Sequence, residues 1–308
     1  MTTAVPRALA RLGQVGAPLG ERTTYRVGGR ARVLVTATTV EDLRSVGEVV
    51  AGEGWPVLVV GRGSNLLVAD SGFDGAVVVL GEPFATVELG PGRVRAGGAT
   101  LLPVLARQVA AAGRRGLEWA VGVPGSVGGA VRMNAGGHGS DVAAVLERVR
   151  VVDLATGDDG EVAAADLALG YRSSAVQPSH VVVEAVFRAE PGDRAAAEAE
   201  LAAIVRWRRE HQPGGQNAGS VFTNPPGDAA GRIIDELGLR GLRIGTARVS
   251  EKHANFIQAD EGGRAGDVLA VMRAVRRRVH EATGLVLRVE QHLVGFGADP
   301  LGDGGEVP

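Results

Sequence analysis

Two glycine-dense segments contain the residue types that could bind a phosphate through the main chain. The first, 61–65, reads Gly-Arg-Gly-Ser-Asn after an apolar run, and the second, 122–139, repeats glycine at short intervals. Because glycine allows close approach of a ligand and tolerates a positive φ, successive N–H groups in such turns can surround an anion such as a pyrophosphate. Crowded turns that merely require glycine are the alternative for both segments.

Two nucleotide-binding motifs are excluded at these segments. A Rossmann fingerprint would need a third glycine at position 66 and a helix after it, but residue 66 is leucine and an apolar, strand-like stretch follows. A P-loop would need Gly-Lys-Ser or Gly-Lys-Thr, which the sequence lacks. The glycines therefore predict a different kind of phosphate contact.

Three polar side chains could act on a substrate. Arg172 follows Tyr171 between two expected strands, where a guanidinium could bind a carboxylate or an enolate, or simply lie at the surface. Ser220 lies in a loop without the Gly-x-Ser-x-Gly pattern of a hydrolase nucleophile, and a lone loop serine is often structural. Glu290 lies in an apolar run, so it needs either a partner or an exposed strand face.

Composition bounds the remaining classes of protein. The chain has 308 residues, which predicts about two domains, and its net charge of −2 provides no electrostatic footprint for nucleic acid or an anionic membrane. Cysteine is absent, which excludes disulfides and thiolate catalysis, and the six histidines lack metal-binding spacing. No apolar run reaches 18 residues and the N-terminus lacks a signal-peptide core, so we expect a soluble, cytoplasmic protein without a metal.

The elements expected to position these residues mix strands and helices. Thr39 predicts a helix start because Asp42 lies three positions later, and Thr100 predicts another. Residues 87–97 predict a hairpin, whereas 117–139 shows no helical period and predicts a long structured loop. The other expected strands are 31–36, 55–60, 76–80, 145–153, 180–187, 243–249, 254–259 and 285–294, and the other helices are 194–210, 233–237 and 265–282, the last with Arg273, Arg276 and Arg277 on its outer face.

The order of these elements favours an α+β fold. Hairpins and irregular alternation argue against a doubly wound parallel sheet. A Pro-Gly-Asp sequence at 191–193 predicts a domain boundary near residue 192, and residues 297–308 predict a mobile polar tail.

Seven segments together resemble the UDP-N-acetylenolpyruvoylglucosamine reductase (MurB) family, flavoenzymes of bacterial peptidoglycan precursor synthesis. Each segment alone is weakly specific, but all seven occur in order across residues 23–295, and the length resembles the shorter family type. The segments are 23–29 (TTYRVGG), 61–68 (GRGSNLLV), 122–139 (GVPGSVGGAVRMNAGGHG), 171–174 (YRSS), 218–225 (AGSVFTNP), 249–257 (VSEKHANFI) and Glu290, five residues before Gly295.

The resemblance implies a specific domain organisation. It implies an α+β, FAD-binding fold of the vanillyl-alcohol-oxidase (PCMH) type with two subdomains, followed by a smaller C-terminal α/β substrate domain. The implied FAD-binding domain is 1–192, with subdomains of about 1–75 and 76–192. The implied substrate domain is 193–296, its last strand returning to the FAD domain, and 297–308 is the tail.

The resemblance also implies an activity and the residues that perform it. The family's FAD-containing, NADPH-dependent enzymes convert UDP-N-acetyl-enolpyruvoylglucosamine to UDP-N-acetylmuramate, and we expect a monomer without nucleic-acid or membrane partners. Arg172 is expected to stabilise an enolate, Ser220 to deliver a proton, and Glu290 to hold charge or assist the proton relay. The implied substrate contacts are Tyr171, Asn224, Lys252 and His253. The implied FAD contacts are Tyr25, Gly61, Arg62, Gly63, Ser64, Asn65, Leu66, Pro124, Gly125, Ser126, Gly128, Gly129, Asn134 and Gly136.

Two places depart from the family pattern, and two other functions stay open. Ala175-Val176 follows the 171–174 segment where an aromatic residue is common, which concerns packing more than chemistry. Thr223 stands where a basic residue is common, which puts a phosphate contact there in doubt, and Arg208, Arg209 or Lys252 could replace it. The alternatives to the reductase are another flavin-dependent oxidase or dehydrogenase with the same FAD fold, and a flavin- or nucleotide-binding protein without turnover.

Overall fold

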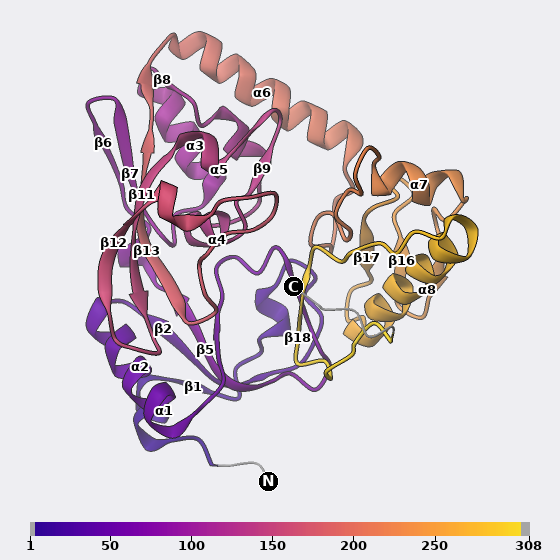
Figure 1. Cartoon of the computed structure of the whole chain (residues 1–308), viewed down its shortest axis with the longest axis horizontal. Coiled ribbons are helices and arrows are strands. Elements are labelled where there is room, and N and C mark those ends of the chain that lie inside the picture. The colour runs from indigo at the N-terminus through magenta and orange to yellow at the C-terminus, as the bar shows by residue number, and fades with distance from the viewer. Residues whose placement is uncertain (1–3, 303–308) are drawn as a thin grey trace. The chain divides into compact units, whose positions relative to one another are not determined.

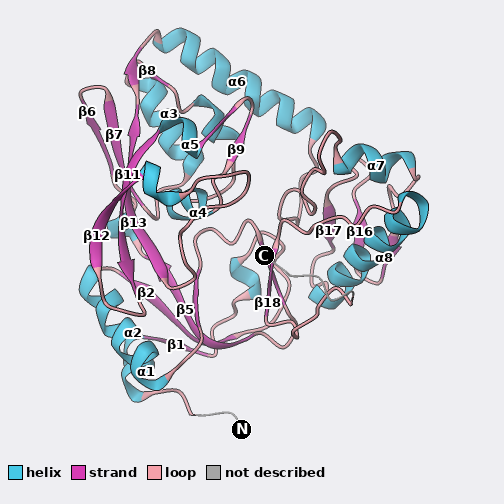
Figure 2. Cartoon of the chain, viewed as in Figure 1, coloured by secondary structure: helices cyan, strands magenta, loops and turns pink. Residues whose placement is uncertain are grey.

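The computed structural model describes residues 4–302, which form two compact units built from interleaved stretches of sequence. The first unit comprises the chain up to Val15, Arg32–Arg62 and Gly75–Arg208. The second comprises Gly16–Ala31, Gly63–Asp74 and the chain from Arg209 onwards. Both units combine helices with strands, as the α+β prediction requires (Figure 1 and Figure 2).

The first sheet of the first unit has four strands in the order β1, β2, β5, β3. Helix α2 places Leu43, Val46 and Val50 on one face, and this face shares a hydrophobic core with the inner residues of β2 and β5. The elements are α1 (Arg7–Leu12), β1 (Gly13–Val15), β2 (Ala31–Ala37), α2 (Val40–Glu53), β3 (Val57–Val59) and β5 (Phe73–Leu80).

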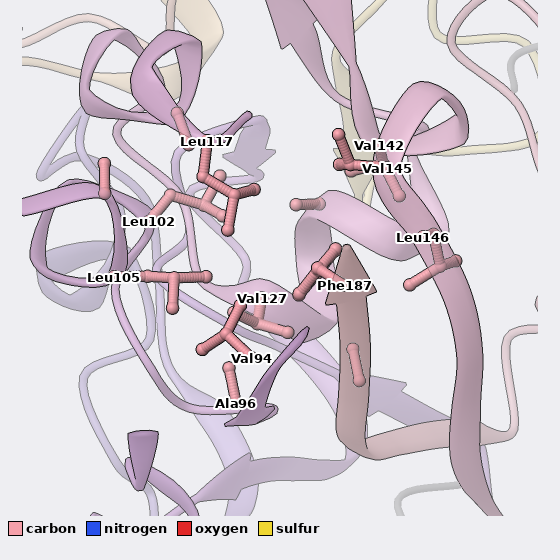
Figure 3. Packing of buried hydrophobic residues seen from close by; sticks show 14 of the residues in the cluster. Val94, Ala96, Leu102, Leu105, Leu117, Val127, Val142, Val145, Leu146 and Phe187 are labelled. Atoms are coloured by element: carbon pink, nitrogen blue, oxygen red, sulfur yellow. The ribbon is translucent and has the colours of Figure 1, made fainter. Parts of the chain in front are cut away.

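The second sheet of the first unit is antiparallel, with five strands in the order β12, β11, β13, β7, β6. Figure 3 shows Leu102, Leu105 and Val127 packed near Val94 and Ala96 of this sheet. The strands are β6 (Val87–Gly90), β7 (Arg93–Gly97), β11 (Leu146–Asp153), β12 (Asp159–Ala163) and β13 (His180–Arg188).

Helices pack against this second sheet and form one core with it, and two short strand pairs belong to the same unit. The helices are α3 (Leu102–Ala111), α4 (Val127–Arg132), α5 (Val142–Val145) and α6 (Arg194–His211). The two-stranded pairs are β8 (Arg114–Arg115) with β14 (Glu190–Pro191), and β9 (Gly136–Gly137) with β10 (Ser140–Asp141).

The second unit has its own core, built around a long amphipathic helix. Helix α8 (Ala265–Thr283) packs on a three-stranded sheet of β15 (Arg243–Ile244), β16 (Ala247–Val249) and β17 (Ile257–Ala259), beside α7 (Ala230–Glu236). In the same unit β18 (His292–Val294) pairs in parallel with β4 (Leu66–Val68). This pair joins the segment after the first glycine loop to the segment that follows Gln291.

Within residues 4–302, four short 3₁₀ helices complete the fold. They are η1 (Gly20–Arg22), η2 (Glu82–Phe84), η3 (Glu118–Gly122) and η4 (Ala164–Leu167).

Several local predictions are confirmed with their expected chemistry. The Thr39 hydroxyl accepts from the N–H of Asp42, whose carboxylate accepts from the N–H of Thr39, which is a complete capping box at α2. The hairpin forms as β6 and β7. The stretch after the first glycine loop is strand β4, as the exclusion of a Rossmann fingerprint requires.

Three local predictions are wrong. Thr100 does not cap α3, because its hydroxyl donates to the Thr86 carbonyl and Leu101 occupies the cap position. The segment 117–139 is not all loop: it contains η3 and α4, whose helical period is hidden by glycine. The predicted strand 285–294 is regular only as β18, with an isolated bridge from Val289 to Phe222 before it.

The end of the chain also differs from the prediction. Arg276 is buried, and its Nε donates to the Leu287 carbonyl, so it does not lie on the outer face of α8. Residues 297–302 are not a free tail, since Leu301 is buried in the second core and Arg273 Nε donates to the Pro300 carbonyl (2.8 Å). Residues 303–308 lie outside the described residues.

The compact units divide the chain elsewhere than the domains we predicted from the resemblance. The last division falls after Arg208, within α6, whose Ala197, Leu201 and Ile204 belong to the first core. The segments 16–31 and 63–74, expected in the FAD-binding domain, group with the second unit. Across residues 4–302, no helix combines the length and apolarity needed to cross a bilayer.

Candidate active site

A pocket in the first unit is lined by the predicted glycine segments. Gly61 follows β3, and a Cβ at this position would lie 2.3 Å from Ser126 Oγ, so a larger residue would require the Ser126 hydroxyl at the start of α4 to turn away. A Cβ on Gly98 would lie 1.9 Å from the Val182 carbonyl oxygen, so the main chain at this lining residue approaches β13 too closely for a side chain. The lining residues are Val59, Val60, Gly61, Arg62, Leu80, Gly98, Ala99, Leu101, Ser126, Gly128, Gly129, Arg132, Val176, His180, Val181 and Val182.

The pocket combines small residues, aliphatic walls and one half-buried cation. Arg132 Nη1 donates to the Val176 carbonyl (3.2 Å), and burial lowers the pKa of its guanidinium, which stays charged at neutral pH. Because exposed main chain beside a cation suits a pyrophosphate, and aliphatic walls suit a flat ring system, the residues present fit a dinucleotide such as FAD. Five of the predicted FAD contacts line this pocket: Gly61, Arg62, Ser126, Gly128 and Gly129.

Arg172 lies at the tip of a tight turn beside this pocket's second glycine segment. Gly170 and Ser173 exchange main-chain hydrogen bonds, and Arg172 between them has φ +54°, a left-handed conformation that is unusual for a non-glycine residue. Its Nη2 donates to the Gly136 carbonyl (3.3 Å), and its guanidinium carbon lies 5.3 Å from the Tyr171 ring centre. The guanidinium is therefore oriented by two contacts within the first unit.

Asn134 connects this turn to the glycine segment. Its Nδ2 donates to the Gly170 carbonyl (2.8 Å), and its Oδ1 accepts from the N–H of Ala143 (2.9 Å). The residue is buried and has φ +38°, so its backbone is strained as well. Asn134 and Gly136, predicted as FAD contacts, thus also hold the Arg172 turn.

Ser220 and Glu290 lie on adjacent segments of the second unit. The N–H of Glu290 donates to the Val221 carbonyl (2.8 Å), and Ser220 forms a bridge with Phe256 on its other side. Both residues are half-buried. The structure thus brings together two of the three predicted catalytic residues, and it places Arg172 in the other unit.

The second half of the first glycine loop belongs to the same unit as Ser220. Gly63 has φ +66° and its carbonyl accepts from the N–H of Thr24 (3.1 Å). The Asn65 Nδ2 donates to the Glu290 carbonyl (3.1 Å), and the Asn65 carbonyl accepts from the N–H of His292 (3.0 Å). Asn65, predicted as a FAD contact, therefore fixes the main chain at Glu290.

Two buried hydroxyl groups behave differently next to this loop. Within residues 4–302, Thr24 Oγ1 is one of two buried side-chain polar atoms that have no hydrogen-bond partner. A ligand bound beside this hydroxyl would supply the missing partner. Tyr25 has no exposed surface, and its hydroxyl donates to Gln291 Oε1 (3.1 Å), while burial raises its pKa. The side chain of Tyr25, predicted as a FAD contact, is part of the second core.

Three of the predicted substrate contacts lie in the second unit. Asn224 is exposed, and its Oδ1 accepts from the N–H of Ala230 at the start of α7 (3.1 Å). Lys252 is exposed and its Nζ donates to the Arg209 carbonyl. His253 is half-buried, and burial, followed by the charge of Arg240, lowers its pKa. A neutral His253 whose Nδ1 accepts from the N–H of Asn255 (3.2 Å) carries its proton on Nε2.

Sequence reasoning missed the buried amides that fix these loops. Asn255 bonds both main-chain groups of Phe222, accepting from its N–H (3.0 Å) and donating to its carbonyl (2.8 Å). Gln291 has no exposed surface and bonds the loop before Ser220. A polar side chain inside an apolar run was the available signal in both cases, although the partners are distant in sequence.

Comparison with known proteins decides the family. Residues 211–294 match the model of the UDP-N-acetylenolpyruvoylglucosamine reductase C-terminal domain, and residues 31–163 match an FAD-binding domain. The chain is similar to the UDP-N-acetylenolpyruvoylglucosamine reductase of Acidiphilium cryptum, with 44% identity over 95% of this chain and 94% of that protein. The chain belongs to the UDP-N-acetylenolpyruvoylglucosamine reductase family. The protein of the same name from Heliobacterium modesticaldum is 40% identical over 94% of this chain and 92% of its own.

A solved member of the family supports the fold as well. The crystal structure of UDP-N-acetylenolpyruvylglucosamine reductase from Thermus caldophilus matches with a TM-score of 0.81 and 38% identity, covering 92% of this chain and 99% of that one. The predicted family and the predicted α+β, FAD-binding fold class are therefore confirmed. The protein is an FAD-dependent oxidoreductase with NADPH as reductant, which confirms the predicted cofactors.

Proposed function

We propose that this protein reduces UDP-N-acetyl-enolpyruvoylglucosamine to UDP-N-acetylmuramate with Arg172, Ser220 and Glu290 as its catalytic residues. The full-length relation to the family supports the reaction. The observation that supports the residues is the hydrogen bond from the Glu290 N–H to the carbonyl of Val221, the residue that follows Ser220. Convergence of Arg172 with this pair is part of the proposal.

FAD would be held by the cradle of Gly61, Ser126 and Gly129 in the first unit. When bound and reduced by NADPH, FAD supplies the hydride that reaches the vinyl carbon of the substrate. The remaining chemistry falls to side chains of this chain, which must hold the charge that develops on the substrate and deliver one proton.

Arg172 is suited to hold that charge. Addition of hydride to the terminal vinyl carbon develops an enolate on the carboxyl-bearing unit, and a guanidinium stabilises it with two parallel donors. The contacts of Arg172 with Gly136 and Tyr171 orient the group before substrate arrives. A preorganised donor of this kind contributes roughly 100- to 1,000-fold to kcat.

Ser220 is the proposed proton donor to the carbon that bears the ether oxygen. A serine hydroxyl is a weak acid, so it needs a strongly basic acceptor, which the enolate provides. Glu290, whose main-chain N–H donates to the Val221 carbonyl, is the residue proposed to hold substrate charge or to return a proton to the hydroxyl. Asn224, Lys252, His253 and Tyr171 remain the proposed contacts to the nucleotide-sugar.

The proposal also covers the cellular location, the oligomeric state and the domains of the enzyme. We propose that it acts in the cytoplasm as a monomer on a small UDP-sugar, without nucleic-acid or membrane partners. The functional domains are proposed as FAD binding by 1–192 and substrate binding by 193–296. The near-neutral net charge of −2 supports the absence of a polyanionic partner.

Anaerobic half-reactions test the function. The purified protein should be yellow, bleach with NADPH under nitrogen, and regain its colour when the enolpyruvyl sugar nucleotide is added. A protein that stays colourless and inactive after FAD addition would contradict the proposal. Fast reoxidation by oxygen with no response to the sugar nucleotide would favour a flavin oxidase of the same fold.

A further inference from the structure

We infer that Gln291 is a positioning residue that holds Ser220 and Glu290 in register for proton transfer. This inference rests on the proposed function, since it concerns the geometry of the proposed donor and its neighbouring carboxylate. Gln291 directly follows Glu290, yet its side chain reaches the loop that contains Ser220. It touches neither cofactor nor substrate in this role and acts only through these two residues.

The amide of Gln291 is buried and bonded at both ends. Its exposed fraction is 0%, its Oε1 accepts from the Tyr25 hydroxyl (3.1 Å) and its Nε2 donates to the Ala218 carbonyl (3.1 Å). The same Nε2 lies 3.4 Å from the Ser220 carbonyl oxygen. Because both ends of the amide have defined partners, the loop 218–220 has little freedom to shift relative to residue 291.

The main chain on either side of Gln291 is fixed as well. The Glu290 N–H donates to the Val221 carbonyl, and the Glu290 carbonyl accepts from Asn65 Nδ2. The chain bends at Gln291 and then enters β18. The side-chain amide therefore closes a ring of hydrogen bonds that runs from Glu290 to Val221, back along the loop to Ala218, and across to Gln291.

An apolar side chain would fill this position at lower cost if packing were its only role. Burial of an amide costs free energy unless each of its polar atoms has a hydrogen-bond partner. Gln291 is such a buried amide, and it lies one residue after the proposed catalytic Glu290. Proton transfer depends on heavy-atom distances of about 2.6–3.2 Å, so a shift of the serine loop by one ångström is enough to slow it strongly. The bonds of Gln291 restrain that loop.

Gln291→Met is the first test, because methionine keeps the length and removes both hydrogen bonds. We expect flavin bleaching by NADPH to stay within twofold of the parent protein, and reoxidation by saturating enolpyruvyl sugar nucleotide to slow by about 10- to 100-fold. The substrate concentration for half-maximal rate should change by less than threefold. Reoxidation within twofold of the parent rate would overturn the inference.

Gln291→Glu is the second test and gives a pH signature. When protonated, a glutamate at 291 accepts from Tyr25 and donates to the Ala218 carbonyl, whereas its carboxylate cannot donate. The reoxidation rate of this variant relative to the parent should therefore fall as the pH rises from 6 to 9. A ratio that is flat over this range and close to one would overturn the inference, even if Gln291→Met fails to fold.

Val271→Ala is the matched control, because Val271 is fully buried in the same core on α8. It should lower the melting temperature while leaving both half-reactions and their pH ratio unchanged, which separates lost stability from lost positioning. The parent protein distinguishes the two hypotheses: if it is not reoxidised by the sugar nucleotide, the proposed function fails. If the parent is reoxidised but both Gln291 variants match it, only the positioning role fails.

Discussion

The side-chain amide of Asn65 donates to the main-chain carbonyl of Glu290 across 225 residues of sequence, with an N···O distance of 3.1 Å. The contact joins the first glycine loop to the segment of the proposed catalytic carboxylate. The parallel pair of β4 and β18 continues it, since Leu66 faces His292 in the register. The loop we assign to the cofactor thus also sets the backbone from which Glu290 projects.

Asn65→Asp should uncouple the loop from the carboxylate segment. The carboxylate has nearly the shape of the amide, but it cannot donate to the Glu290 carbonyl and would face it with like charge. We expect a loss of about 1–3 kcal/mol in unfolding free energy and slower flavin reoxidation by the sugar nucleotide. Chemical denaturation and anaerobic stopped-flow absorbance measure the two effects, and an unchanged reoxidation rate would show that the contact is irrelevant to Glu290.

Gly61→Ala should weaken FAD binding by more than tenfold. The new Cβ would lie 2.3 Å from Ser126 Oγ, so the Ser126 hydroxyl must turn away and the cradle changes shape. Gly52→Ala is the control, because nothing lies within 4 Å of its added Cβ and alanine favours a helix. Flavin fluorescence titration gives both affinities. Recovery of FAD binding in the Gly61→Ala, Ser126→Ala double variant would confirm the steric cause.

Ser220→Ala should separate the half-reactions. Removal of the hydroxyl takes away the proposed proton donor but leaves the pocket of the first unit untouched, so bleaching by NADPH should stay nearly intact while reoxidation by the sugar nucleotide slows. General acid catalysis of this type contributes roughly 100- to 10,000-fold. Equal loss of both half-reactions would mean that Ser220 has only a structural role.

Acid should weaken the cap of α2 through Asp42. The main-chain N–H of Thr38, with further donors from Thr38 and Thr39, lowers the pKa of this carboxyl below its ordinary value. A lowered folded-state pKa means that the stabilisation is present above the unfolded value of about 3.9 and is lost as the pH falls through the folded value. Asp42→Ala should cost about 1 kcal/mol at pH 7, and this difference should shrink below pH 4.

Glu41→Ala is the matched control for the cap. Glu41 lies in the same turn and is exposed, and its contact with Arg44 is a 3.4 Å surface pair. Its removal should change the unfolding free energy by less than about 1 kcal/mol. Urea denaturation at pH 7 and pH 3.5 measures both variants, and equal pH dependence of the two would argue against the capping explanation.

Local signals in the sequence predicted local structure well. Thr39 and Asp42 lie three residues apart, so their capping box was visible in the sequence. Thr100 presents the same residue type, but its hydroxyl finds a partner in Thr86, a contact that depends on the packed hairpin rather than on neighbouring residues. Helix α4 was hidden because Gly128 and Gly129 remove its helical pattern while its buried side chains stabilise it.

Long-range hydrogen bonds account for most of what the sequence did not reveal about the site. The glycine segments predicted a cradle, and the pocket around Gly61 and Ser126 agrees with it. The spacing of residues in the sequence predicts neither the bond from Asn65 to Glu290 nor the burial of Gln291. The first contact joins residues 225 positions apart, and Gln291 bonds a residue 73 positions away. Such partners become visible only when the chain is folded.

The parallel pairing of β4 with β18 has a consequence for how the protein is made. Strand β4 is synthesised early, yet it gains its neighbour only after residues 292–294 have emerged from the ribosome. Until then Asn65 has no Glu290 carbonyl to bind, and the second core lacks its closing segment. Contacts of such long sequence separation form late, so a nascent chain should complete the arrangement around Glu290 only after residues 292–294 are available to pair with β4.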